Sequence, residues 1–127
     1  MQLLLDTHAL LWWLAGDTRL SPPARAAIGD DENAVFVSAA SAWEISTKHR
    51  LGKLDAAALA GQLGKILITQ GFVALDITFD HAERAGALPG LPKDPFDRML
   101  IAQAQAANLT LVSNEDLFDG YGLTRLW

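Results

Sequence analysis

Four acidic residues follow or lie beside short apolar runs, in positions from which they could together bind metal. Asp6 follows an apolar run of three leucines, and Glu115 comes shortly after the apolar segment 109–112. Asp97 lies in the pattern KDPFDRMLIAQA, and Glu44 lies in the apolar segment SAASAWEIS. Open α/β sheets place their sites outside the carboxyl ends of their strands. We therefore expect these carboxylates to share one crevice.

The expected chemistry follows from the charge and the atom type of these ligands. Carboxylates held close together repel one another, and protonation, cationic partners or a bound metal relieve that cost. The chain contains no cysteine, so no thiolate is available to favour zinc. Oxygen ligands select a hard ion, Mg²⁺ with Mn²⁺ as the other choice. The pattern indicates metal-assisted attack on a phosphate.

Strands and helices alternate along the sequence. The chain has 127 residues, half of them hydrophobic and a fifth charged, which is typical of a single domain over residues 1–127. Strands are expected over residues 2–6, 34–37, 72–75, 110–112 and 123–127. Helices are expected over residues 7–15, from the Ser21 cap, over 38–50, 55–67, from Thr78 or Asp80 to 87, and over 94–107, with a loop at 89–92 and a short turn at 116–118. This order predicts an α/β fold with a central parallel sheet of about five strands covered by helices.

The N-terminus and the cysteine content predict a cytoplasmic protein without a membrane partner. The first residues, MQLLLDTHALLWWLAGD, lack a basic segment, and Asp6 and His8 interrupt their apolar stretch. A membrane-spanning helix would need about 20 consecutive apolar residues. Without cysteine, nothing points to an oxidising compartment.

The net charge of −5 at first argues against a nucleic-acid partner, which normally requires a basic surface. Metal bound to four acids would neutralise four of these charges. The acidity therefore belongs largely to the expected site, and the charge does not exclude RNA.

Each acid also has a purely structural interpretation. Asp6 could only cap the following helix, and Asp94 could form a capping box in which Asp97 reaches back to it. Glu44 could pair on its helix surface with Lys48, four residues later. Glu115 could interact favourably with the N-terminus of a short helix. Their shared position at or beside strand ends favours the site over four separate coincidences.

Four segments of the chain resemble, in order, the motif blocks of PIN-domain ribonucleases. These segments are DTHALLWWL, SAASAWEISTKHRLGKL, KDPFDRMLIAQAQA and LVSNEDLFDGYGLTRLW. Within that family the chain is most similar to the VapC-like toxins of bacterial toxin-antitoxin pairs. The resemblance implies a three-layer PIN-like sandwich and a Mg²⁺-dependent endoribonuclease that hydrolyses single-stranded or looped RNA.

The resemblance also implies the roles of the acids. Asp6, Glu44 and Asp97 match the first three family acids, and Asp94 is a further metal-ligand candidate ranked below Asp97. The fourth block departs from the family pattern of a threonine or serine followed two positions later by aspartate. Glu115 stands at that position with Asp116 beside it, so either could be the fourth ligand.

Substrate and partners are further expectations. RNA contacts are expected from four basic residues that flank the second and third motifs, namely Lys48, Arg50, Lys53 and Arg98. A solvated helix end is the structural alternative. The family resemblance implies a VapB-like antitoxin and a homodimer. Tryptophans 12, 13 and 43 could stack on bases, but packing is the expected role.

Two other functions are compatible with parts of the pattern. A phosphatase with Asp6 as nucleophile would need a second acid two residues later, where this chain has His8. A PIN-like module that binds RNA or protein without cutting would explain the departure at Glu115. Three of the four expected acids remain in place, which favours the nuclease.

Overall fold

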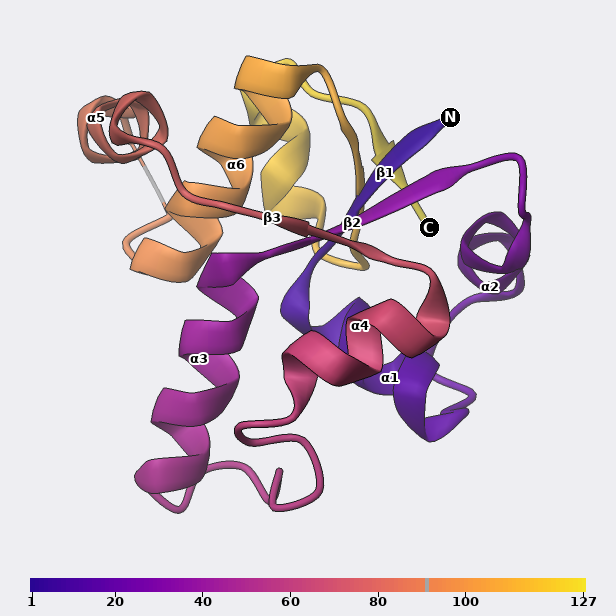
Figure 1. Ribbon diagram of the computed structural model, residues 1–127. Coiled ribbons are helices and arrows are strands. Elements are labelled where there is room, and N and C mark those ends of the chain that lie inside the picture. Colours follow the sequence, from indigo (N-terminus) through magenta and orange to yellow (C-terminus); the bar gives the residue numbers. More distant parts are fainter. Residues whose placement is uncertain (91) are drawn as a thin grey trace.

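A five-stranded parallel sheet lies at the centre of the protein. The computed structural model describes residues 1–90 and 92–127. The strands are β1 (Gln2–Leu5), β2 (Ala34–Ser38), β3 (Val73–Leu75), β4 (Thr110–Val112) and β5 (Arg125–Leu126). Their order is β3-β2-β1-β4-β5, and each neighbouring pair is parallel (Figure 1). The predicted parallel α/β sheet is confirmed, although β5 is shorter than expected.

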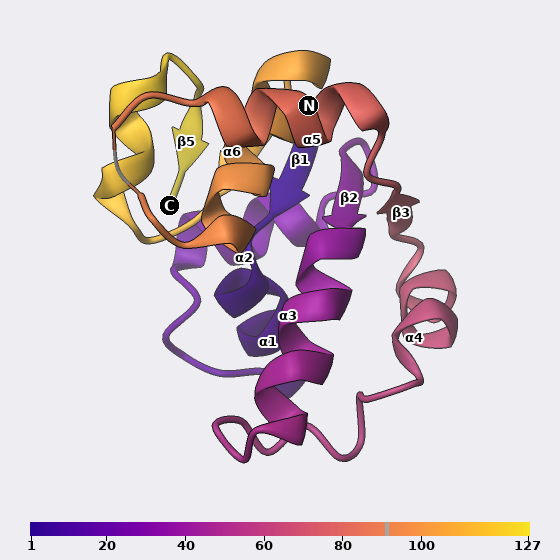
Figure 2. The same ribbon diagram turned by 90° about the vertical axis from the view of Figure 1, so that its left-hand side faces the viewer.

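Within the described residues, seven helical segments connect these strands. They are α1 (Thr7–Ala15), α2 (Pro22–Gly29), α3 (Ala39–Arg50), α4 (Leu63–Gln70), α5 (Phe79–Ala87), α6 (Pro95–Ala107) and the 3₁₀ turn η1 (Asp116–Tyr121). Figure 2, turned by 90°, shows α3 extending away from the edge at which the arrow of β2 ends. The loop expected over residues 89–92 includes Leu91, which lies outside the described residues.

Alternate residues of the strands enter two separate cores. Leu3 and Leu5 pack in one hydrophobic cluster with residues of α1, α2 and α4. Leu4, between them, packs in the other cluster with Leu100 and Ile101 of α6. All three leucines of β1 are fully buried, because successive strand side chains point to opposite faces and helices cover both faces. The result is a three-layer sandwich.

Local hydrogen bonds begin the helices at the residues the sequence indicated. The Ser21 side chain accepts from the backbone N–H of Ala24, with prolines in the first turn of α2. Thr78, rather than Asp80, caps α5. Asp94 caps α6 by accepting from Phe96 N at 2.8 Å. These caps satisfy N–H groups that have no partner within the helix.

The helix expected over residues 55–67 is wrong in its first half. Turns occupy residues 57–62, and α4 begins only at Leu63. Gly61 has a φ of 76°, a left-handed conformation that ends a right-handed helix and suits glycine because it has no Cβ. The apolar spacing across Leu59 and Leu63 therefore spans a turn and a helix.

No helix in residues 1–90 and 92–127 is long and apolar enough to cross a membrane.

Candidate active site

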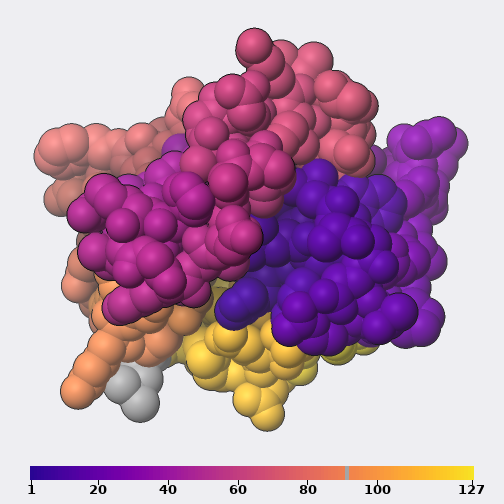
Figure 3. All heavy atoms as spheres, turned by 90° about the horizontal axis from the view of Figure 1, so that it is seen from below, coloured from indigo at the N-terminus to yellow at the C-terminus, as the bar shows by residue number. Residues whose placement is uncertain are grey.

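The expected acids line one pocket at the carboxyl edge of the sheet. The pocket has a volume of about 190 Å³, and its lining residues are Asp6, Thr7, His8, Glu44, Lys48, Asp94, Asp97 and Glu115. They come from the start of α1, from α3, from the start of α6 and from the segment after β4. Figure 3 shows the chain segments of α1, α3, α6 and the C-terminus meeting on one face of the molecule. Five predicted acids thus converge on one pocket.

Asp6 is both a helix cap and a pocket acid. It is 5% exposed, and its Oδ1 accepts from Ala9 N at 2.7 Å. Burial raises the pKa of Asp6, while hydrogen bonds from Ser113 and Ala9 and the nearby His8 oppose that rise. The capping interpretation is therefore correct without excluding the site, since one carboxylate does both.

Asp94 and Asp97 have different environments although they lie three residues apart. Asp94 is exposed and uses Oδ1 to cap α6, accepting also from Asp97 N at 3.1 Å. Asp97 is partly buried. Burial, and then the nearby acids Asp94, Glu115, Glu44 and Asp6, raise the pKa of Asp97 to about 7. The reciprocal capping-box bond from Asp97 is not among the bonds of the described residues, so the pocket rather than the cap explains Asp97.

Glu44 is buried mid-helix, and its two oxygens have different partners. It is 7% exposed. Oε1 accepts from the Thr7 hydroxyl at 2.6 Å, and Oε2 is ion-paired with Lys48 Nζ. The pKa of Lys48 is raised, first by its hydrogen bond to Glu44. The ion pair considered from the sequence does form, but it forms inside the pocket.

Thr7 is a site residue that the sequence analysis missed. Its buried hydroxyl lies 3.0 Å from Ser41 Oγ as well as 2.6 Å from Glu44. The signal was the dipeptide Asp6-Thr7, but its local meaning is helix initiation. Only the packing of α1 against α3 brings Thr7 to a residue 37 positions away.

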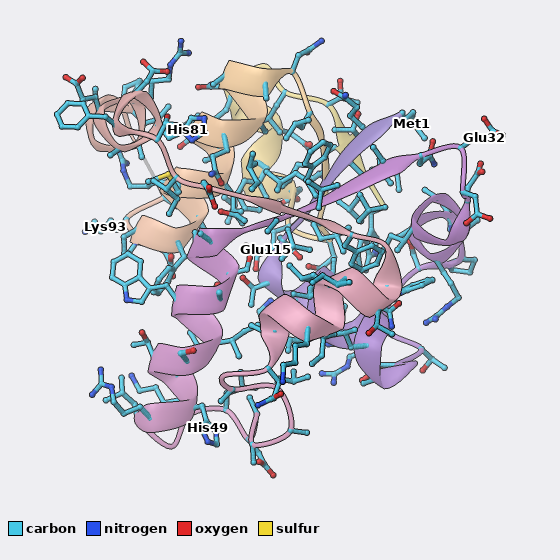
Figure 4. The ribbon with its side chains drawn as sticks, viewed as in Figure 1. Met1, Glu32, His49, His81, Lys93 and Glu115 are labelled. Carbon is cyan, nitrogen blue, oxygen red and sulfur yellow. The ribbon has the colours of Figure 1, made fainter. Side chains whose placement is uncertain are left out.

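Glu115, not Asp116, lines the pocket from the fourth block. Glu115 Oε1 lies 4.0 Å from His8 Nδ1, whereas Asp116 is exposed and outside the pocket lining. Ser113 is fully buried, and its Oγ accepts from Glu115 N at 3.0 Å. In the view of Figure 4, Glu115 is labelled beside the first turns of α3, and His49 lies at the far end of that helix.

The predicted RNA-binding residues separate into three groups. Lys48 lines the pocket. Arg50 and Lys53 are exposed at the end of α3 and in the following turn, outside that lining. Arg98 points elsewhere: its guanidinium donates to the backbone carbonyls of Ala85, Gly86, Leu88, Gly90 and Pro92. The structure thus gives Arg98 a clamping role between α5 and α6.

The tryptophans also differ from one another. Trp12 stacks with His8 at a centroid distance of 5.5 Å, and Trp13 packs beside Phe72 at 6.2 Å. Both are partly buried, as expected for packing. Trp43 is 60% exposed and meets the edge of Phe96 at 4.9 Å. The packing role expected for Trp43 is therefore met only by its contact with Phe96, and most of its side chain is exposed.

The donor chemistry of the pocket fits a hard divalent ion. Every acid in the lining supplies carboxylate oxygens, the ligands that Mg²⁺ and Mn²⁺ prefer. Burial is the first cause of the raised pKa of Asp97, and repulsion from the neighbouring acids of the pocket adds to it. In residues 1–90 and 92–127, however, no three such side chains already form a ready metal-binding group. Binding would need side-chain movement, and Glu44 would have to exchange a partner.

Comparison with known proteins identifies the family. The sequence model of the PIN domain matches residues 3–122. The chain therefore belongs to the PIN domain family. No curated protein sequence matches it.

Several solved structures share the fold at low sequence identity. Mycobacterium tuberculosis VapC20, described as a sarcin-ricin loop cleaving toxin, is 19% identical, with a TM-score of 0.69 over 96% of each chain. The DNA-bound VapBC structure from Salmonella typhimurium is 18% identical, with a TM-score of 0.70 over 98% of this chain and 96% of that chain. The VapBC2 structure from Rickettsia felis, bound to a promoter DNA fragment, is 17% identical, with a TM-score of 0.68 over 98% and 97%. These similarities confirm the PIN-like fold.

Proposed function

We propose that this protein is a metal-dependent endoribonuclease and the toxin of a toxin-antitoxin pair. The observation that carries the proposal is the convergence of Asp6, Glu44, Asp97 and Glu115 on one pocket. Membership of the PIN family supports it, as does the description of the structurally similar VapC20 as a sarcin-ricin loop cleaving toxin.

Asp6, Asp97, Glu44 and Glu115 would hold Mg²⁺ or Mn²⁺, with Asp94 as an additional carboxylate at the rim. A bound divalent ion would supply a water of lowered pKa and would stabilise negative charge on a phosphodiester. The remaining work falls to the chain itself. Ala9 N orients Asp6, and Thr7 orients Glu44. These bonds hold the carboxylates in fixed directions, which preorganises the site.

The proposed substrate is single-stranded or looped RNA. The pocket of about 190 Å³ is lined by residues of several helices. A backbone phosphate of RNA can enter it only where no paired second RNA strand blocks the approach. Unpaired RNA can splay out its bases and present its backbone in this manner. Lys48 lies inside the pocket, and Arg50 and Lys53 extend the positive charge to the end of α3 and the following turn. Arg98 is left out of the proposed RNA contacts, because its guanidinium donates to five backbone carbonyls.

An antitoxin is the proposed protein partner. Two structurally similar proteins are described as VapBC bound to DNA, and another is described as FitAB bound to a DNA fragment. A basic side chain of such a partner would meet carboxylates ready to accept charge-assisted hydrogen bonds. The resemblance to VapC-like toxins also implies a homodimer, which is part of this proposal.

The deciding experiment is cleavage of a mixed cellular RNA pool by purified protein. Mg²⁺ or Mn²⁺ should produce discrete fragments, and EDTA or the Asp97→Asn variant should abolish them. Because Asp97 is proposed to bind metal and not to stabilise the fold, Asp97→Asn should have the circular dichroism spectrum of the wild type. Asp31→Asn, which changes an exposed acid outside the pocket, is the matched control and should cut normally.

A non-catalytic module that binds RNA or protein is the second candidate. The ion pair between Glu44 and Lys48 favours it, because it engages an acid that the nuclease needs. An absence of fragments with either metal, together with RNA binding unaffected by EDTA, would establish this alternative over the nuclease.

A further inference from the structure

Lys48 neutralises an acid that the proposed metal would need. Glu44 is buried, and an ionised carboxylate in that position requires a partner. Thr7 provides one hydrogen bond at 2.6 Å. Lys48 Nζ provides the balancing charge at the other carboxylate oxygen. Both oxygens of Glu44 are therefore engaged within the described part of the chain.

The two partners of this ion pair differ in their access to solvent. The Lys48 side chain is 36% exposed, whereas that of Glu44 is 9% exposed. Lysine carries its ammonium on a flexible four-carbon stem that can reach water without backbone movement. Glu44 is held by α3 and by Thr7 and has no such route. Lys48 is thus the partner that can leave.

We propose that Lys48 is an exchangeable counter-cation for Glu44. It neutralises the buried carboxylate until a divalent ion enters the pocket, and the ion then displaces it. This inference rests on the proposed metal-dependent function and deepens it, because it says how the chain's own residues admit the metal.

The exchange changes the role of Lys48 in the same pocket. Its ammonium has three N–H donors, and it lines the pocket together with Asp94 and Asp97. After leaving Glu44 it is free to contact an RNA phosphate beside the acids. One side chain then serves the empty site and the substrate-bound site in turn.

Removal of Lys48 should therefore affect two properties in opposite directions. Without metal, Glu44 loses its counter-charge, and the free energy of unfolding falls. With metal, the ion no longer competes with an ammonium group, and its affinity rises. A lysine that merely stabilised the helix would produce the first effect without the second.

Calorimetric titration of the RNA-free protein with Mn²⁺ tests this proposal. The variants are Lys48→Met, which removes the charge, and Lys48→Arg, which keeps it. Arg50→Met is the matched control, because it removes one positive charge two residues away and outside the pocket lining. We expect Lys48→Met to bind Mn²⁺ about threefold to fivefold more tightly than the wild type. Lys48→Arg should not bind more tightly, and Arg50→Met should change affinity less than about twofold, because exposed charges are well screened.

The possible results separate this inference from the proposed function. Wild-type Mn²⁺ binding with unchanged or weaker binding by Lys48→Met would overturn the exchange and leave the function standing. Equal gains for Lys48→Met and Arg50→Met would also overturn it, because net charge would explain both. An absence of Mn²⁺ binding in every variant would overturn both proposals. Circular dichroism verifies folding, and Lys48→Gln, with the same expected gain, replaces Lys48→Met if the latter does not fold.

Discussion

The Thr7 hydroxyl donates to Glu44 Oε1 at 2.6 Å and so joins the first turn of α1 to the middle of α3. Both residues are buried. A short hydrogen bond to an ionised acceptor is stronger than one between neutral groups. This contact sets the direction of the Glu44 carboxylate. It comes from α1, the helix that Asp6 caps. It therefore couples the first two motifs of the chain.

Replacement of Thr7 by valine should weaken both the fold and the site. Valine keeps the branched shape but cannot donate, which leaves Glu44 Oε1 without its bond in a buried place. We expect the free energy of unfolding to fall by about 1–2 kcal/mol and RNA cleavage to fall about tenfold or more. Urea unfolding and a cleavage assay measure the two effects. Thr18→Val, at an exposed position, is the control, and wild-type cleavage by Thr7→Val would contradict the orienting role.

Stability of the metal-free protein should decrease as pH rises. The pKa of Asp97 is about 7 in the folded protein against an ordinary value of 3.8, so the folded state holds this proton more tightly. The resulting contribution to stability is complete below about pH 3.8 and is lost as pH rises through about 7. Asp97→Asn, which cannot ionise, should remove this part of the pH dependence.

Thermal unfolding in EDTA between pH 5 and pH 8.5 measures this effect. The wild-type midpoint should fall more steeply than that of Asp97→Asn between pH 5 and about pH 7, and the difference between the two curves should stop growing above that. Asp31→Asn changes an exposed acid outside the pocket and should follow the wild type. Parallel curves for the wild type and Asp97→Asn would show that the proton on Asp97 is not the cause.

The choice between the fourth-block acids can be tested by amide substitution. Glu115 lines the pocket, whereas the exposed Asp116 does not. Glu115→Gln removes charge at the site and should reduce cleavage by at least about 100-fold, since a metal ligand is weakened. Asp116→Asn should remain within about twofold of the wild type. The reverse ranking, measured by RNA cleavage under saturating metal, would assign the role to Asp116.

Arg98 is expected to stabilise the fold and not to bind RNA, and one variant tests both roles. Arg98→Met removes the guanidinium that donates to Ala85 O and Pro92 O at 2.9 Å each. Because the carbonyls then lose a charged donor, we expect the free energy of unfolding to fall by about 2–3 kcal/mol. Lys93→Met removes the same charge from a nearby exposed residue and should cost little. A stable Arg98→Met protein with weakened RNA binding would restore the original assignment.

Local sequence determined much of this protein because local interactions decide strands and helix starts. The apolar run before Asp6 has no polar alternation, which suits a strand covered on both faces, and its three leucines are fully buried. Asp94 and Ser21 cap helices through hydrogen bonds that span two or three residues. The same locality explains the error before α4, where Gly61 breaks an otherwise suitable apolar pattern.

Only the tertiary structure decided which polar atoms meet. Sequence could not choose between Glu115 and Asp116, because the path of the chain after β4 aims one of them into the pocket. Nor could it separate Lys48 from Arg98 as basic residues beside the site. Packing places Lys48 in the pocket and surrounds Arg98 with carbonyl oxygens. Residue types and spacings set the local conformations. The distances between elements depend instead on how side chains pack in the two cores. These distances determine which charged groups line the pocket and how exposed they are.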